Sequence, residues 1–481
     1  MILRAYQTKA VQAIRDAYAS GYRAPLLCLP TGGGKTVIFS HIAANSSARG
    51  KRVLILVHRI ELLRQTAAAL KRAGINPGLI NPAYTPNYRA GVQVAMVQTM
   101  AKRTHYFQKM PFDLIITDEA HHVVSKTYRD ILAAFPNAYQ LGVTATPVRG
   151  DGKGLGVTAG GVYDTLIMGP AVAELIEGGY LVKPAIYVPR DRVDLTGVRS
   201  RMGDYDKQEL EARMDKPTIT GNAVEHYRRA LDGLPAVAFC VSVKHAQHVA
   251  AEFQAAGYRS YAVDGNMEDA QRAGVLNGLA TGAVQVVTSC DIISEGTDIP
   301  AIAGAILLRP TQSTGLYLQQ VGRALRTMEG KERAVILDHV GNVLKHGLPD
   351  EDRDWSLDGE PAKKKKKAEE PDVRVRMCLS CYAVFSAGAS ECPQCGVAVP
   401  AKARKVQETE GELREITAED RANIARAQKK EVGRARTLEE LERIEKERGY
   451  KRGWAHYVYN ARHGRADFAV KSAGNVGKVT E

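Results

Sequence analysis

Residues 29–36, with the sequence Leu-Pro-Thr-Gly-Gly-Gly-Lys-Thr, limit what this chain can fold into more than any other stretch. They follow the apolar run 25–29 and precede the apolar run 37–44, so a strand, a glycine loop and a helix are expected in that order. Such a loop turns its backbone N–H groups toward phosphates, while a lysine adds positive charge and a hydroxyl ligates Mg²⁺. The stretch predicts a nucleotide-binding loop formed by Thr31, Gly32, Gly33, Gly34, Lys35 and Thr36.

One position departs from the strict phosphate-loop pattern, which has a glycine where this chain has Leu29. A glycine-rich turn before an ordinary helix is therefore an alternative interpretation of these residues taken alone. The rest of the chain decides between the two.

Four further strands are predicted in the first third of the chain, and each ends in polar residues. The apolar runs 52–57, 92–97 and 112–117, and a fourth at 138–143, alternate with helical stretches, which predicts a parallel sheet covered on both faces. In such sheets, ligands bind where the strands end. The polar residues at these ends are Arg59, Gln98, Thr99, Asp118, Glu119, Thr144 and Thr146.

The carboxylate pair Asp118 and Glu119 is the second anchor of the predicted site. Beside a Mg²⁺–phosphate group, one carboxylate holds the metal and the other orients or deprotonates the attacking water. We assign Asp118 to the magnesium ion and Glu119 to the water. A solvated acidic turn is the alternative, but the preceding apolar strand aims the pair at the predicted phosphate loop.

A second alternating pattern follows, with apolar runs at 235–241, 284–288, 303–308 and 334–338 and a shorter one at 261–263, but without a second phosphate loop. Instead, the stretch 317–327 carries Gln319, Arg323 and Arg326 on a predicted helix. Arginines brought to a phosphate loop from a partner lobe stabilise charge that develops during phosphoryl transfer. Taken alone, this helix could instead be an exposed basic helix.

The order of these motifs resembles that of superfamily 2 helicases of the DEAH-box type. The matching stretches lie between residues 4 and 338 and read RAYQ, LPTGGGKT, VLILVHR, VQT, TDEAHH, GVTATP, SEGTDIP and QQVGRALR. The chain is most similar to the bacterial DNA-repair helicase RadD and related phage helicases. XPB-like helicases and the motor subunits of type III restriction enzymes are more distant relatives.

The resemblance implies an α/β protein with two tandem RecA-like parallel-sheet lobes that bind ATP between them. It places Arg4 and Gln7 at the adenine, and Gln319, Arg323 and Arg326 at the γ-phosphate. It places Gly296, Thr297 and Asp298 where both nucleotide and nucleic acid are sensed. Coupling or strand-contact roles fall to Arg59, Gln98, Thr99, His121, Thr144 and Thr146.

The last third of the chain holds two cysteine pairs, Cys378-x₂-Cys381 and Cys392-x₂-Cys395. Two such pairs at close spacing predict a tetrahedral, structural zinc ribbon. The five lysines at 363–367 lie in a predicted charged linker, where they are either solvated or in contact with phosphates. The segment beyond residue 401 predicts a basic helical tail, which either forms a small helical core or stacks on bases through its aromatic residues.

The expected organisation is a first lobe at 1–182, an inter-lobe connection at 183–215 and a second lobe at 216–345. A linker at 346–372, the zinc ribbon at 373–400 and the helical tail at 401–481 follow. A net charge of +13 and a pI near 9.3 favour a polyanionic partner. No apolar run has membrane-spanning length, so a cytoplasmic protein of a bacterium or a phage-infected cell, with no membrane partner, is expected.

We therefore expect an ATP-dependent DNA helicase or translocase that uses ATP, Mg²⁺ and structural Zn²⁺ and acts on single-stranded or branched DNA. RNA remodelling is an alternative, because the motor motifs do not select the sugar. An ATP-switched zinc-ribbon binding protein without unwinding activity and the motor of a restriction complex are further alternatives. The ribbon or the tail could also contact other replication or repair proteins.

Overall fold

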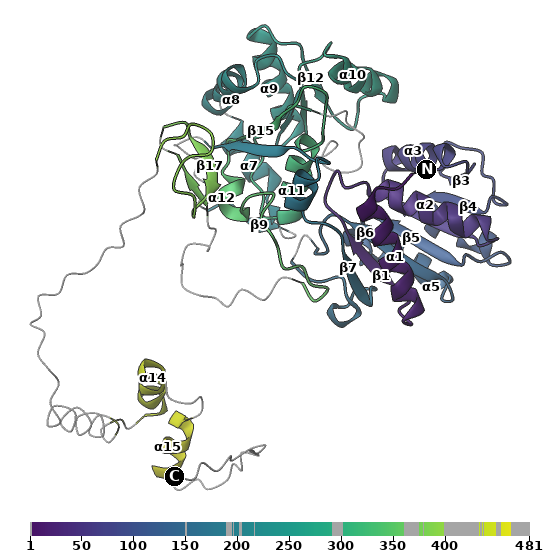
Figure 1. The fold of residues 1–481 in the computed structure, drawn as a ribbon, viewed down its shortest axis with the longest axis horizontal. Coiled ribbons are helices and arrows are strands. Elements are labelled where there is room, and N and C mark those ends of the chain that lie inside the picture. Colours follow the sequence, from purple (N-terminus) through teal and green to yellow (C-terminus); the bar gives the residue numbers. More distant parts are fainter. Residues whose placement is uncertain are drawn as a thin grey trace, which may run out of the picture. The chain divides into compact units, whose positions relative to one another are not determined.

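The computed structural model describes residues 2–149, 152–188, 195, 197–201, 204–215, 217–290, 302–359, 375–378, 380–398, 432, 435, 437–448 and 454–462. It forms two compact units, Met1–Ala401 and Lys402–Glu481. The first unit contains one parallel and one mostly parallel sheet, each with helices on both faces (Figure 1). The predicted α/β architecture with two RecA-like lobes is thereby confirmed.

The first sheet has seven strands in the order β3-β4-β2-β5-β6-β1-β7, and every neighbouring pair is parallel. β1, β2 and β5 are buried along their whole length, as expected for apolar runs covered on both faces, whereas β7 at the edge of the sheet is partly exposed. The strands are β1 (Pro25–Cys28), β2 (Val53–Val57), β3 (Gly78–Ile80), β4 (Val92–Met96), β5 (Leu114–Asp118), β6 (Tyr139–Thr144) and β7 (Thr165–Met168).

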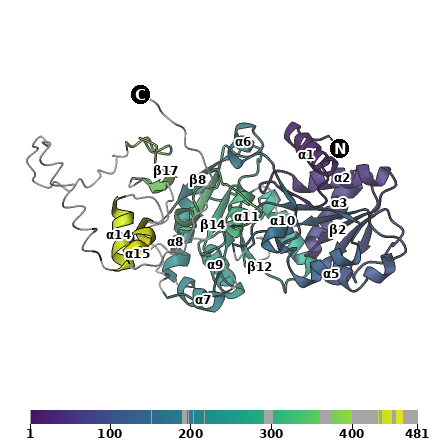
Figure 2. The same ribbon diagram turned by 90° about the horizontal axis from the view of Figure 1, so that it is seen from below.

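Neighbouring strand residues of this lobe contribute to opposite cores. Leu27 packs with α1 (Ala5–Ala19), α2 (Lys35–Ala48) and α3 (Ile60–Arg72), whereas Leu26 packs with α4 (Val97–Ala101) and α5 (Lys126–Ala134). Figure 2 shows α1 and α2 on one side of β2 and α5 on the other. Short 3₁₀ turns complete the lobe, namely η1 (Thr104–Phe107), η2 (Ala120–His122) and η3 (Val157–Ala159).

The second sheet has eight strands in the order β12-β13-β11-β14-β15-β8-β17-β16. The strands from β12 to β8 are parallel, whereas β17 and β16 add to β8 in antiparallel fashion. The strands are β8 (Lys183–Tyr187), β11 (Ala236–Phe239), β12 (Ser260–Val263), β13 (Val286–Ser289), β14 (Gly304–Leu307), β15 (Arg333–Asp338), β16 (Val375–Met377) and β17 (Ala383–Ser386).

The helices of the second lobe also lie on two faces. One core contains residues of α6 (Val172–Glu177), α10 (Asp269–Thr281), α11 (Thr314–Ala324) and α12 (Asn342–His346). The other contains residues of α8 (Pro217–Ala230) and α9 (Val243–Ala255). The hairpin of β9 (Ser200–Arg201) and β10 (Asp204–Tyr205) precedes α7 (Lys207–Met214).

The packing moves the boundary between the lobes relative to the predicted one. Leu175 of α6 and Leu181 pack in the core of the second lobe, although both fall within the first-lobe range 1–182. The predicted connection 183–215 contains β8, which lies inside the second sheet. In the same range, the Asp204 carboxylate accepts hydrogen bonds from the Gln312 amide at 2.7 Å and the Thr311 hydroxyl at 3.0 Å, so β10 is tied to the loop before α11.

Residues 348–359, here called the strap, join the two lobes a second time. On the second lobe, the Arg353 guanidinium donates to the His346 carbonyl at 3.1 Å, and the Leu348 side chain packs against the core of that lobe. On the first lobe, the Gly156 amide donates to the Leu357 carbonyl at 2.9 Å, and the Leu357 side chain packs against the core that includes α5. This half of the predicted linker 346–372 is therefore held at both ends.

The second unit, 402–481, contains α14 (Leu438–Arg448) and α15 (Trp454–Arg462). Leu441, Ile444 and Ala455 form its small buried core, against which Trp454 and Tyr459 pack. The small helical core is therefore present, and base stacking by the aromatic residues of this tail stays a prediction. Within the described part of the chain, no helix is both long and apolar enough to cross a bilayer.

The surroundings of His346 predict that the second lobe becomes less stable as the pH falls. Its Nε2 atom lies 3.0 Å from the Thr311 carbonyl and its Nδ1 atom lies 3.1 Å from the Thr314 hydroxyl, so the ring is a neutral donor and acceptor. Burial lowers the pKa of His346 from 6.5 to about 4. Between pH 6.5 and pH 4, His346 is protonated in the unfolded state but stays neutral in the folded state. The contribution of His346 to the free energy of unfolding is therefore present in full above pH 6.5 and is lost as the pH falls toward 4.

Denaturant unfolding at pH 7 and pH 4.5 tests this expectation. We expect His346→Gln to lose less stability between the two values than the wild type, by roughly 2–3 kcal/mol. An equal loss in both proteins would contradict it.

Candidate active site

The phosphate loop connects β1 to α2, and two of its glycines adopt the left-handed backbone conformation. Gly32 has φ 89° and Gly34, the residue before α2, has φ 84°, a conformation that residues with a Cβ rarely adopt. The side chain of Leu29 is fully buried, and a Cβ added at Gly33 would lie 2.8 Å from its Cγ atom. Leu29 thus packs beneath the loop, which explains an apolar residue where the strict pattern has glycine.

The amine of Lys35 lies inside this loop. Its Nζ atom donates to the Leu29 carbonyl at 3.3 Å. The residues at the loop therefore fit a nucleotide phosphate, because a positive charge and the first backbone N–H groups of α2 converge there.

Residues at the start of α1 brace the loop from the other side. The Gln7 side chain accepts from the Arg4 amide at 3.0 Å and donates to the Gly33 carbonyl at 3.4 Å. The Tyr6 hydroxyl donates to the same carbonyl at 2.9 Å, and the Arg4 guanidinium lies 4.6 Å from the centre of the Tyr180 ring. Tyr6 and Tyr180 are additions to the predicted site, although Tyr6 stands between two residues that the sequence singled out.

The predicted carboxylates lie at the end of β5. Asp118 is buried and accepts from the Glu119 amide at 3.0 Å, and Glu119 takes a left-handed φ of 48° that a side chain rarely adopts. Burial, followed by the neighbouring Glu119 carboxylate, raises the pKa of Asp118 to about 6, while Lys35 opposes the rise. A buried carboxylate near a lysine and a phosphate loop fits a magnesium ligand, because a divalent cation would favour its charged form.

A chain of polar contacts leads from Glu119 to the end of β6. The His121 Nδ1 atom lies 3.5 Å from the Glu119 carboxylate and 3.4 Å from the Thr144 hydroxyl. That hydroxyl donates to the Thr146 carbonyl at 2.9 Å. The structure therefore brings together four of the residues predicted for catalysis or coupling.

Two histidines extend this group beyond the prediction. The His122 ring lies 4.2 Å from the His121 ring and 4.6 Å from the His58 ring, measured between centroids. His58 is also one of the groups that lower the pKa of Asp118. Their positions directly after β2 and within the stretch that follows β5 are the sequence signal that could have identified them.

The arginine helix α11 of the second lobe meets the phosphate loop of the first. A Cβ added at Gly322 would lie 2.7 Å from Thr31 Cβ, and one added at Gly32 would lie 3.6 Å from Arg326 Cγ. Gln319 and Arg323 are buried in the same helix. At the start of α11, a Cβ on Gly315 would lie 2.9 Å from the Thr146 hydroxyl. The two halves of the predicted site are therefore in contact.

The other predicted residues divide into two groups. Arg59 directly precedes α3, and Gln98 and Thr99 lie in α4, so all three stand where strands of the first sheet end. Gly296, Thr297 and Asp298 lie outside the described residues. The roles assigned to all of these residues remain predictions.

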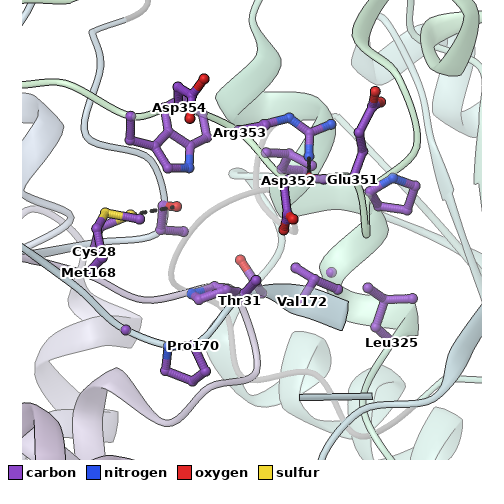
Figure 3. Close-up of a pocket in the computed structure, with 18 residues that line it drawn as sticks. Cys28, Thr31, Met168, Pro170, Val172, Leu325, Glu351, Asp352, Arg353 and Asp354 are labelled. Atoms are coloured by element: carbon purple, nitrogen blue, oxygen red, sulfur yellow. Dashed lines mark hydrogen bonds between the residues drawn. The ribbon is translucent and has the colours of Figure 1, made fainter. Parts of the chain in front are cut away.

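A cavity of about 340 Å³ opens beside the loop (Figure 3). Thr31 lines it from the first lobe, Leu325 from the second, and Asp352 and Asp354 from the strap. The close-up shows the strap residues across the cavity from Thr31 and Pro170. The strap thus borders the space between the lobes next to the phosphate loop.

The four cysteines of the predicted ribbon gather at one point. Their sulfur atoms all lie within 4.8 Å of one another, with Cys378–Cys395 at 3.6 Å and Cys381–Cys392 at 3.5 Å. Sulfurs around a tetrahedral zinc ion stand about 3.8 Å apart, so the group fits zinc. Backbone amides of Cys381 and Ser380 lower the pKa of the Cys378 thiol to about 6, which favours the thiolate form of this one ligand, whereas burial raises the pKa of the Cys381 thiol.

Two parallel lobes, a phosphate loop on one and an arginine helix on the other, define a nucleotide-driven motor of the RecA-like class. Two known protein families match parts of this chain and support this class. The "Type III restriction enzyme, res subunit" family matches residues 1–149, and the "Helicase conserved C-terminal domain" family matches residues 222–328. A 51.5 kDa protein of a Lactococcus phage (isolate 7-9) is 34% identical over 367 residues, or 76% of each chain.

The chain belongs to the superfamily 2 helicases, in the group related to XPB and restriction-enzyme motor subunits, and is an ATP-hydrolysing enzyme. A candidate ATP-dependent helicase of Saccharomyces cerevisiae, IRC3, is 30% identical over 361 residues, which are 71% of this chain and 52% of that protein. The chain thus spans about half of the yeast protein's length.

A solved structure shares the fold at low sequence identity. A fragment of an HsdR subunit of a type I restriction enzyme from Vibrio vulnificus YJ016 has a TM-score of 0.57 at 22% identity. The match covers 75% of this chain and 68% of that one.

Substitution of Gly322 tests the contact between the lobes. We expect Gly322→Ala to lower the kcat of ATP hydrolysis about tenfold, because the added methyl group would push α11 away from Thr31. Gly274→Ala in α10 is the matched control, since a methyl group there meets nothing within 4 Å. The measurement is the rate of phosphate release at saturating ATP. Equal rates in the two variants would contradict a role in catalysis for the contact between Gly322 and Thr31.

The cysteine group predicts zinc in the purified protein. We expect elemental analysis to find one zinc ion per chain, and Cys392→Ser to lose it, because three thiolates close a structural site poorly. Cys290→Ser, outside the group, should retain the metal. Wild-type protein purified without chelators but free of zinc would refute the assignment.

Proposed function

We propose that the chain is an ATP-driven DNA translocase or helicase that acts on single-stranded or branched DNA in repair, recombination or replication. The observation that carries the proposal is the approach of Gly322 and Arg326 to Thr31 and Gly32. A catalytic site divided between two lobes is complete only when they meet. Hydrolysis is then coupled to the motion of one lobe against the other.

Each side of the site has a distinct task in this proposal. Lys35 and the loop amides bind the phosphates, while Thr36 and Asp118 hold the magnesium ion, which neutralises phosphate charge when bound. Glu119 orients the attacking water, and Gln319, Arg323 and Arg326 stabilise the charge that develops on the γ-phosphate. Arg4 and Gln7 bind the adenine.

The contacts of His121 support a coupling role for the end of β6. Because this side chain lies between the Glu119 carboxylate and the Thr144 hydroxyl, a shift at the water-orienting residue reaches Thr146. Thr146 in turn touches the start of α11. We assign this path, together with Gly296, Thr297 and Asp298, to the exchange between nucleotide and nucleic acid.

DNA is favoured as the substrate by the relatives. An archaeal protein of Sulfurisphaera tokodaii, 26% identical over 377 residues, is named as a DNA 3'-5' translocase. Two proteins with similar folds, the restriction-modification enzyme LlaBIII and the helicase MrfA, were solved bound to DNA. The net charge of +13 suits any nucleic acid, so the relatives rather than the charge favour DNA over RNA.

The cysteine group completes the proposal with a structural zinc ion. Since β17 continues the second sheet, the ribbon is carried by the second lobe and moves with it. We assign it to contact with DNA or with a replication or repair protein.

ATP turnover compared across nucleic acids tests the proposed substrate. We expect single-stranded or forked DNA to raise kcat at least about tenfold over the basal rate, because nucleic acid would favour the closed lobes. Stimulation by RNA alone would overturn the DNA assignment. Hydrolysis with neither strand displacement nor translocation would leave an ATP-switched binding protein.

Lys35→Ala separates hydrolysis from DNA binding. We expect it to reduce ATP turnover at least about 100-fold by removing the charge at the phosphates, while DNA affinity stays within about threefold. Exposed Lys244 supplies the control substitution Lys244→Ala. Wild-type turnover in Lys35→Ala would refute the site.

A further inference from the structure

Lys331, in the loop between α11 and β15, gathers backbone carbonyls from two separate segments. Its Nζ atom donates to the carbonyl of Ile302 at 2.5 Å and to that of Arg326 at 2.9 Å, and also to that of Ala324. An ammonium group has three donors, and here each one finds a backbone acceptor. Neither the sequence motifs nor the proposed mechanism assigns this residue a role.

Two of these carbonyls belong to the end of the arginine helix. Ala324 is the last residue of α11, where helix carbonyls lack partners within the helix and carry partial negative charge. Lys331 therefore caps the helix with a positive charge supplied from seven residues further along the chain.

At this cap, the chain changes from helix to extended backbone. Arg326 forms a β-bridge with Leu181, and the Val182 amide donates to the Leu325 carbonyl at 2.9 Å. The Arg326 side chain and the Leu181 side chain both lie beside Gly32 of the phosphate loop. The position of the helix end therefore determines the position of the Arg326 backbone, and with it the distance of the Arg326 side chain from the nucleotide phosphates.

The third carbonyl lies on a different segment. Ile302 is fully buried and leads into β14, directly after the stretch that contains Gly296, Thr297 and Asp298. A single ammonium group therefore joins the end of the arginine helix to the end of that stretch.

The Lys331 amine forms hydrogen bonds with these carbonyls instead of with water. Burial lowers the pKa of Lys331 from 10.5 to about 8, so the group is still mostly protonated at neutral pH. An amine held this way is costly to desolvate unless its hydrogen bonds are made, so the three acceptors are needed to keep it in place.

We propose that Lys331 is a positioning residue for ATP hydrolysis, which fixes the backbone of Arg326 against the phosphate loop and locks it to the segment at Ile302. The inference rests on the proposed role of Arg326 at the γ-phosphate. Lys331 does not touch the nucleotide in this proposal. It acts through Arg326, and its removal leaves the arginine present but misplaced.

A double-mutant cycle in the full-length protein distinguishes positioning from general stability. We expect Lys331→Met to lower kcat for ATP about tenfold or more, with the KM for ATP within about threefold, because the phosphate loop itself is unchanged. Arg326→Ala should be slow as well. If Lys331 acts through Arg326, the double variant will be no slower than Arg326→Ala alone.

Three measurements accompany the cycle. Thermal unfolding establishes that each variant is folded at the assay temperature, and Lys244→Met controls for the loss of one positive charge at an exposed site. Lys331→Arg keeps the charge and the donors, so it should recover most of the lost kcat. Should Lys331→Met fail to fold, the cycle is run with Lys331→Arg, whose smaller effect must also vanish in the Arg326→Ala background.

The outcomes separate the two proposals. A multiplicative loss in the double variant, or wild-type kcat in folded Lys331→Met while Arg326→Ala is slow, overturns the role of Lys331 and leaves the proposed function intact. Unchanged turnover in Arg326→Ala refutes instead the proposed role of that arginine.

Discussion

The close approach of a glycine on α11 to the phosphate loop is the contact on which the rest of this molecule depends. A side chain at Gly322 would clash with Thr31, so the backbone of the second lobe at Gly322 packs directly against the Thr31 side chain of the first lobe. This contact requires both parallel sheets to direct the ends of their strands toward a common space. The left-handed Gly32 of the loop and the bridge between Leu181 and Arg326 lie next to it.

Much of this arrangement could be predicted from the sequence because it depends on burial and on strand ends. β1 and β2 consist of apolar residues alone, β5 and β6 are apolar over most of their length, and the polar residues Asp118 and Thr144 end these last two strands. The predicted second-lobe helix became α11, with Gln319 and Arg323 buried and Arg326 just beyond its end. In these cases, local pattern and tertiary structure agree.

Other features depend on information that no local pattern contains. The sequence around β8 predicts part of a connection, because the partners of this strand, β15 and β17, lie far along the chain and because Pro184 stands at its start. The strap is acidic and resembles a solvated linker, yet it is held by the backbone carbonyl of Leu357 and by the Arg353 side chain. Lys331 acts on carbonyls, which every residue has, so its identity alone could not reveal its partners.

The strap also gives the molecule a mechanical property. Leu348, packed against the second-lobe core, and Leu357, held on the first lobe, are nine residues apart, and a fully extended chain of that length spans about 30 Å. While both anchors hold, the lobes can separate along this edge only as far as that length allows, whatever happens at the nucleotide. The segment is therefore a second connection of fixed length between the lobes, in addition to the chain that leads from β7 to α6.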